Sequence, residues 1–168
     1  MIIFDFDQTL VDTSPVEALR TARRWQDVMR RASDLKVYDG VHELLGELRE
    51  RRQKLAIVTK SPDMVPKAFI RAHRWPIDIV VGYHQVKKRK PDPEGLLLAL
   101  SQAREMPTGC FHIGDQPEDT EAARAAGILA VGAAWGLNDA TNLEASKPNA
   151  IFKTVAECRN FLLEKIGR

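Results

Sequence analysis

Short apolar runs alternate along this chain with longer amphipathic segments, and this alternation restricts its fold more than any other feature. Runs that are apolar at nearly every position are typical of parallel strands buried on both faces, and the amphipathic segments between them supply helices to cover those faces. We therefore predict a three-layer α/β fold with a parallel sheet. The expected strands are 2–6, 55–59, 77–82, 110–114, 129–133 and 150–152, and the expected helices are about 15–33, 40–52, 62–73, 93–104, 118–126 and 154–165.

Helix boundary signals support this reading. Ser61 followed by Pro62 predicts an N-cap and a first helical residue, and Asp92 followed by Pro93 repeats the pattern. Gly127 stands where a helix of the predicted length ends, in the position that favours a left-handed residue.

Composition and length favour a single globular domain spanning 1–168, without linker or repeat. The chain is 44% hydrophobic and 29% charged, and its net charge of +2 does not indicate a nucleic acid or a membrane as partner. No apolar stretch approaches the about 20 residues that cross a bilayer, and an acidic strand end among the first residues does not fit a signal peptide. We expect a cytoplasmic protein. Cys110 and Cys158 lack metal-ligand spacing and are expected to be reduced, packed thiols.

Polar residues follow several of the expected strands. Asp5 and Asp7 end the first, Thr59 ends the second, Lys90 lies beyond the third and Asp115 ends the fourth. In open parallel sheets the ligand lies outside the carboxyl ends of the strands, near the point where strand order reverses. We therefore expect these side chains to meet at one edge of the sheet.

The acidic residues of this set predict a cation site. Asp5 and Asp7 are two positions apart, so on a strand they would point to the same side. Asp119 lies one helical turn beyond Asp115. A solvated turn would explain the first pair, and a favourable helix dipole would explain Asp119. Neither explains Asp115 together with Asp5 and Asp7, and these three acids converging at one sheet edge favour oxygen ligation of Mg²⁺ instead.

Thr59 and Lys90 are candidates for binding phosphate. A hydroxyl with free N–H groups at a helix N-terminus suits an anion, although an ordinary N-cap would have the same residues. Lys90 ends the basic run 87–90, and Pro91 favours an extended conformation for it. A solvated basic loop is the alternative for this run.

Taken together, these residues resemble the four ordered motifs of the haloacid dehalogenase superfamily. The motifs are Asp5-x-Asp7-x-Thr9, then Thr59, then Lys90-Pro91, then Gly114-Asp115-x-x-x-Asp119. Three further segments are similar to the phosphoglycolate-phosphatase-like branch: Tyr38-Asp39-Gly40-Val41, Lys90-Pro91-Asp92-Pro93-Glu94 and Ala134-Trp135-Gly136. The resemblance runs from residue 2 to the last expected helix and implies a Rossmann-like core.

The resemblance implies a magnesium-dependent phosphatase. Asp5 would attack phosphorus, and Asp7 would be the general acid and base. Thr59 and Lys90 would hold the phosphoryl group, with Lys60 and Gln8 as further substrate-binding candidates. The Mg²⁺ ligands would be Asp5, Asp7 through its backbone carbonyl, and Asp115, with Asp119 as a second-sphere or alternate ligand.

The chain departs from the family pattern in two places. Gln8 stands where relatives commonly have Gly, and it would either touch substrate or shape the turn. The insert at about 13–37 is long enough for one long helix only, so the cap is minimal or absent. Its arginines would be a solvated face or a basic rim that attracts anions. An open site suits a macromolecular phosphate, or a small metabolite if a homo-oligomer covers the site.

Two other functions share these features. A phosphorylation-dependent binding module of the receiver type also has a parallel sheet, an acidic cluster, a Thr and a Lys, but its acceptor Asp ends the third strand, where this chain has 79–82 without an Asp. A haloacid dehalogenase-like fold kept for binding alone would be expected to lack a motif residue, and each motif residue is present here.

Overall fold

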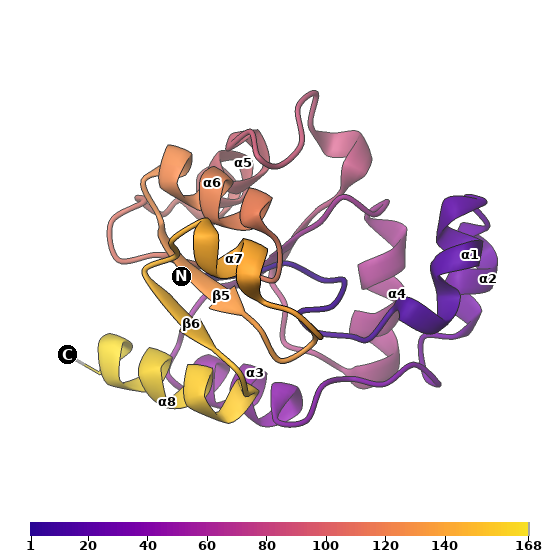
Figure 1. The fold of residues 1–168 in the computed structure, drawn as a ribbon, viewed down its shortest axis with the longest axis horizontal. Helices are drawn as coiled ribbons and strands as arrows, with labels where there is room; N and C mark the ends of the chain where they lie inside the picture. Colours follow the sequence, from indigo (N-terminus) through magenta and orange to yellow (C-terminus); the bar gives the residue numbers. More distant parts are fainter. Residues whose placement is uncertain (168) are drawn as a thin grey trace.

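This computed structural model describes residues 1–167, so the last residue of the predicted domain, 168, lies outside the described part. It contains a six-stranded parallel sheet in the order β3-β2-β1-β4-β5-β6, and Figure 1 shows helices on both sides of it. The predicted three-layer α/β fold is confirmed. The strands are β1 Ile2–Phe4, β2 Leu55–Val58, β3 Ile79–Val81, β4 Phe111–Gly114, β5 Leu129–Ala133 and β6 Ala150–Phe152.

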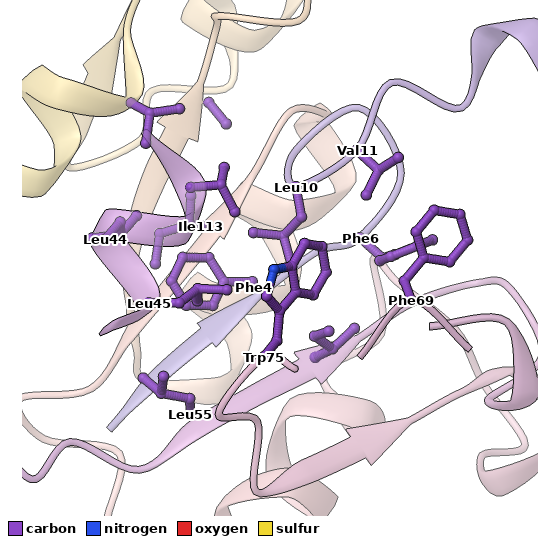
Figure 2. Close-up of a cluster of buried hydrophobic side chains, with 14 of the residues drawn as sticks. Phe4, Phe6, Leu10, Val11, Leu44, Leu45, Leu55, Phe69, Trp75 and Ile113 are labelled. Atoms are coloured by element: carbon purple, nitrogen blue, oxygen red, sulfur yellow. The ribbon is translucent and has the colours of Figure 1, made fainter. Parts of the chain in front are cut away.

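Two hydrophobic clusters, one on each face, hold the layers together because alternate residues of β1 point in opposite directions. Ile2 and Phe4 pack with α3 (Val41–Glu50), α4 (Met64–His73) and α8 (Val155–Ile166). Ile3 packs on the other face with α5 (Glu94–Ala103) and α6 (Pro117–Ala126). The first cluster continues past the strand, where the Phe6 and Phe69 rings meet edge to face with centroids 5.0 Å apart (Figure 2).

The strand order places a topological switch point between β1 and β4. The chain runs outward from β1 through β2 to β3 and then returns to lay β4 against the other side of β1. Crevices at the carboxyl ends of such strand pairs are the usual ligand sites of open α/β sheets. Asp5 follows β1 and Asp115 follows β4, so both acids lie at this point.

The helix boundary signals were right at one end and wrong at another. Gly127 ends α6 with φ 72°, as predicted for a left-handed cap. Asp92 Oδ1 accepts a hydrogen bond from the backbone N–H of Glu94, but Pro93 is the N-cap and α5 begins at Glu94, one residue later than predicted. The predicted start of α4 at Ser61-Pro62 is wrong, because the helix begins at Met64. The Ser61 hydroxyl is used elsewhere, in the site described below.

The insert at about 13–37 is not the single long helix that its length suggested. It forms a 3₁₀ turn η1 (Ser14–Val16) and two short helices, α1 (Glu17–Thr21) and α2 (Trp25–Arg30). Arg23, between the two, has φ 54°, a left-handed conformation that an α-helix cannot contain. The break lets α2 bury Val28 in the cluster that contains α4, while α1 stays at the carboxyl edge of the sheet.

Two smaller expectations concern the cysteines and the helix lengths. Cys110 and Cys158 are both buried, and neither forms a disulfide, as predicted. Within residues 1–167, the helices are all too short or too polar to span a bilayer.

The remaining elements are a 3₁₀ turn η2 (Tyr83–Gln85) after β3 and a short helix α7 (Thr141–Ala145) before β6.

Candidate active site

Lys90 is the centre of the site. Its Nζ lies 2.7 Å from Oδ1 of Asp5 and 2.5 Å from Oδ1 of Asp119, and it also donates to the Val58 carbonyl at 3.2 Å. The Lys90 side chain is only 5% exposed. A buried ammonium needs charged partners to offset its desolvation, and here two carboxylates and one carbonyl supply them. Two predicted site residues far apart in the sequence thus bind the same ammonium group.

Asp119 is held by the first turn of α6 and by the strand beneath it. Its Oδ2 accepts from the backbone N–H of Gln116 at 3.0 Å, and its Oδ1 lies 3.1 Å from Nε2 of the buried His112 on β4. Gly114 makes this placement feasible, since a Cβ on it would lie 2.2 Å from Cγ of Asp119. Lys90 and Gln116 therefore use both oxygens of Asp119.

Asp115 completes a group of three buried carboxylates. One ligand oxygen from each of Asp5, Asp115 and Asp119 lies within 4.8 Å of the others. Thr9 donates to Oδ1 of Asp115 at 3.1 Å, and the Gln116 side-chain amide donates to its Oδ2. The structure thus brings Asp5 and Asp115 together as expected, with Asp119 and not Asp7 as the third carboxylate.

Burial and mutual repulsion change the acidity of these groups. Burial raises the pKa of Asp5 well above its ordinary value, with Lys90 opposing the rise. Burial and the neighbouring Asp119 raise the pKa of Asp115 to about 6. Burial would also raise the pKa of Asp119, but Lys90 and His112 outweigh it and the pKa falls. Burial alone would lower the Lys90 pKa, but Asp119 and Asp5 raise it above its ordinary value.

The donor set fits a divalent cation. Three ionised carboxylates against one ammonium leave two negative charges, which one divalent ion balances. All the side-chain donors are carboxylate oxygens, which hard ions such as Mg²⁺ prefer to nitrogen or sulfur. Both oxygens of Asp119 and both oxygens of Asp115 already have donors, whereas Asp5 accepts from Lys90 at Oδ1, so Asp5 is the best placed ligand of the three.

The carboxylate of Asp7 points to a different set of partners. Its Oδ2 accepts from Ser61 Oγ at 3.0 Å and from Thr59 Oγ1 at 3.4 Å, and it pairs with Nη2 of Arg20 at 2.9 Å. Its Oδ1 is buried and has no hydrogen-bond partner among residues 1–167. The Asp7 side chain does not belong to the three-carboxylate group, and the expected metal contact through its backbone carbonyl stays a prediction.

Gln8 and Lys60 lie outside the acidic centre. Gln8 adopts φ 61°, and its Oε1 accepts a hydrogen bond of 2.6 Å from the Tyr38 hydroxyl. Lys60 is exposed and forms an ion pair with Glu118 at the start of α6. Of the two roles considered for Gln8, these contacts favour shaping of the turn.

Three residues of the site were missed from the sequence. Ser61 was interpreted as a helix cap and Arg20 as one of several arginines on a solvated or basic face, and His112 was not singled out within the expected strand 110–114. Only Ser61 had a local signal, because a second hydroxyl directly follows the Thr59-Lys60 strand end. Arg20 contacts Asp7 and His112 contacts Asp119. Neither Arg20 nor His112 belongs to a sequence motif that would have indicated this contact.

Two segments that carried the resemblance brace the loop after β1. The Trp135 indole N–H donates to the Thr9 carbonyl at 2.9 Å. Gly136 lies so close that a Cβ would be 2.5 Å from the Tyr38 hydroxyl and 2.6 Å from the Gln8 carbonyl. The Tyr38 and Trp135 segments therefore determine where the loop that carries Asp7 lies.

Comparison with known proteins agrees with this geometry. A family model for haloacid dehalogenase-like hydrolases matches residues 16–133. The phosphoglycolate phosphatase of Synechococcus elongatus is 31% identical, with 93% of each chain covered. The phosphoglycolate phosphatase of Pseudomonas putida is 29% identical over 68% of this chain and 43% of its own length. The pyrophosphatase PpaX of Listeria monocytogenes is 33% identical over 71% of this chain and 56% of its own. The chain thus spans about half the length of these last two relatives.

Solved structures share the fold. A hydrolase from Pseudomonas syringae superposes with a TM-score of 0.80 at 23% identity, covering 97% of each chain. A HAD-superfamily hydrolase from Ehrlichia chaffeensis superposes with a TM-score of 0.74 at 22% identity, covering 98% of this chain and 96% of its own.

Proposed function

Because this chain belongs to the haloacid dehalogenase-like hydrolase family, we propose that it is a magnesium-dependent phosphatase that hydrolyses a phosphate monoester through an aspartyl-phosphate on Asp5. One observation carries the proposal. Asp5, held by the buried Lys90 ammonium, lies at the switch point of the sheet beside two further buried acids, Asp115 and Asp119. Phosphoryl transfer depends mainly on positioning and charge neutralisation, and this group of side chains can supply both.

The proposed reaction has two steps. An oxygen of Asp5 forms a bond to phosphorus while the bond to the ester oxygen breaks, and Asp7 gives its proton to the departing alcohol. Asp7 then takes a proton from the water that attacks the aspartyl-phosphate, which releases phosphate and restores Asp5. We assign the proton transfer to Oδ1 of Asp7, since Oδ2 is engaged by Ser61, Thr59 and Arg20.

Asp5, Asp115 and the Asp7 backbone carbonyl would hold the metal. A bound Mg²⁺ would neutralise charge on the phosphoryl oxygens. Lys90 orients the attacking carboxylate of Asp5, and it also adds positive charge beside the phosphoryl site. His112 and Gln116 fix Asp119, so that Asp119 keeps Lys90 in place.

Thr59 is proposed to bind the phosphoryl group and Lys60 to bind the substrate, whereas Gln8, the other substrate-binding candidate, is assigned to shaping the turn. The insert at 13–37 is proposed as a minimal cap on a single domain. The relatives named as phosphoglycolate phosphatases and pyrophosphatases favour a small phosphorylated substrate over a macromolecular one. A homo-oligomer that covers the site and a cytoplasmic location stay predictions from the sequence.

The test is hydrolysis of para-nitrophenyl phosphate with 5 mM Mg²⁺ or with EDTA, using wild type, Asp5→Asn and the control Asp34→Asn. Asp34 is exposed and lies outside the site. We expect turnover that depends on Mg²⁺, a fall of more than about 1000-fold for Asp5→Asn, and wild-type rates for the control. A folded wild type that releases no nitrophenol with Mg²⁺ would overturn the proposal and favour the alternative of a phosphorylation-dependent binding module.

A further inference from the structure

Arg20 and Asp7 form an ion pair in which each partner keeps one unsatisfied atom. Nη2 of Arg20 lies 2.9 Å from Oδ2 of Asp7, and the two side chains are 21% and 15% exposed, in that order. Within residues 1–167, the buried side-chain atoms that lack a hydrogen-bond partner are Nε of Arg20 and Oδ1 of Asp7. An arginine and a carboxylate often pair through two parallel bonds, and such a pair would use both of these atoms. Here the contact runs through one oxygen of Asp7, and the other oxygen stays free.

Contacts within the insert hold the Arg20 guanidinium in this orientation. Its Nη1 donates to the Thr13 hydroxyl at 3.2 Å and to Oε2 of Glu17 at 2.8 Å. Thr13 is fully buried, and Glu17 begins α1, the same short helix that carries Arg20. Because the guanidinium is planar and rigid, bonds at Nη1 restrict where Nη2 and Nε can lie. The insert therefore fixes the group that meets Oδ2 of Asp7.

Two hydroxyl groups from the core contact the same oxygen of Asp7. Oδ2 accepts from Ser61 Oγ at 3.0 Å and from Thr59 Oγ1 at 3.4 Å, in addition to its ion pair with Arg20. A protonated carboxyl group has one oxygen that carries the proton and one that only accepts. With three partners on Oδ2, the accepting role falls to that oxygen, and a proton on Oδ1 leaves all three contacts in place. Oδ1 is thus the oxygen that can exchange a proton with a substrate.

We propose that Arg20 is a positioning residue for proton transfer by Asp7: it holds Oδ2, so that Oδ1 is presented to the ester oxygen of the substrate. The inference rests on the proposed phosphatase function and adds to it a role of the insert in the chemical steps. As the bond between phosphorus and the ester oxygen breaks, that oxygen takes the proton from Oδ1, and Arg20 keeps its contact with Oδ2. A buried polar atom without a partner is costly, and a role of Oδ1 in proton transfer explains why it is left free.

Two esters of similar size separate this role from a structural one. Benzyl phosphate releases an alcohol that must be protonated as it leaves, whereas 2,4-dinitrophenyl phosphate releases a stable phenolate. The ratio kcat/KM covers the steps up to release of the alcohol or phenolate. A general acid contributes about 100- to 10,000-fold, so we expect Arg20→Met to lower this ratio about 10- to 100-fold with benzyl phosphate and less than about twofold with the dinitrophenyl ester.

Two further variants control for charge and for location. Arg20→Lys keeps a cation of similar reach and should recover part of the loss with benzyl phosphate. Arg24 lies on the same insert, where it is 62% exposed and paired with Asp27. Arg24→Met should therefore match wild type with both esters, and a loss with benzyl phosphate as large as that of Arg20→Met would overturn the inference.

A double-mutant cycle tests whether Arg20 acts through Asp7. Single-turnover release of benzyl alcohol is compared in wild type, Arg20→Met, Asp7→Asn and the double variant, with Mg²⁺ present. We expect the rate of the double variant to stay within about twofold of Asp7→Asn, because effects of residues that act on one another are not additive. Additive losses in the double variant, or equal losses of Arg20→Met with both esters, would overturn the inference and leave the phosphatase proposal standing. A folded wild type that hydrolyses neither ester with Mg²⁺ would overturn the phosphatase proposal, and this inference with it.

Discussion

The Lys90 ammonium lies 2.7 Å from Oδ1 of Asp5, although 85 positions separate the two residues. The same ammonium contacts Asp119 at 2.5 Å, so one buried cation links residues that follow β1, precede α5 and begin α6. The contact therefore ties the sheet to α5 and α6 and also aligns the carboxylate proposed as the nucleophile. Stability and activity depend here on the same ion pairs.

Replacing Lys90 with Met should affect both properties. Two buried carboxylates lose their cation, and breaking a buried pair costs about 3–5 kcal/mol. We expect a loss of this size in the free energy of unfolding by urea at pH 8 with EDTA, and phosphatase activity below about 1% of wild type. Lys88→Met is the matched control, because the Lys88 side chain is 76% exposed. Unchanged urea stability of the Lys90 variant would contradict the assigned role.

Replacing Asp115 with Asn should separate metal binding from folding. The change removes one of the three neighbouring carboxylate charges, and it keeps an oxygen that can accept the hydrogen bond from the Thr9 hydroxyl. We expect the melting temperature in EDTA to stay the same or rise. Mg²⁺ at 100 times its Kd should stabilise wild type by about 2.7 kcal/mol, and the variant should lose most of this gain. Differential scanning calorimetry measures both values, with Asp34→Asn as control, and a full Mg²⁺ response in the variant would argue against Asp115 as a ligand.

Asp115 should also make the metal-free protein sensitive to pH. Its pKa is raised from the ordinary 3.8 to about 6, so between these values the folded state binds more protons than the unfolded state. The contribution of Asp115 to stability is therefore present below pH 4 and is lost as the pH rises through 6. Urea titrations in EDTA should show wild type losing stability relative to Asp115→Asn between pH 4 and 7. Parallel pH curves for the two proteins would exclude this effect.

Two glycine substitutions should have opposite effects. Gly114→Ala would place a Cβ 2.2 Å from Cγ of Asp119, so Asp119 must move away from Lys90. We expect a loss of about 1–3 kcal/mol in stability together with most of the activity. Gly46 lies inside α3 with no atom within 4 Å of an added Cβ, so Gly46→Ala should stabilise the protein by about 0.5–1 kcal/mol without changing activity. Thermal melts and nitrophenyl phosphate assays measure both effects, and a fully active Gly114→Ala enzyme would contradict the first.

The sequence was informative where a residue's place follows from its own strand. Strands in a parallel sheet end at one edge, so Asp5 and Asp115 could be placed together before any contact was known. Asp119 followed from the helical repeat after Asp115. Gly127 could be recognised as a helix end because glycine adopts a left-handed conformation without steric cost, whereas the left-handed Arg74 and Arg104 that end α4 and α5 carry no such signal.

The sequence was misleading where two local structures compete. Ser61-Pro62 has the pattern of a helix start, but the Ser61 hydroxyl donates to Asp7 and the helix begins at Met64. The segment 15–33 was expected to form one amphipathic helix, but a left-handed residue at Arg23 divides it into two short helices, and Val28 of the second packs in the core. Tertiary contacts outweighed the local preference in both places, since local propensities differ by only about 1 kcal/mol.

The sequence by itself determined the class of fold and the acids and lysine of the site, because strand periodicity and position at a strand end are local properties. Only the tertiary structure decided the pairing of Arg20 with Asp7 and the contact of His112 with Asp119. These depend on how the insert packs against the loops after β2 and β3, and on which side chain lies beneath α6. Such distances are set by packing between distant segments, which no spacing along the chain encodes.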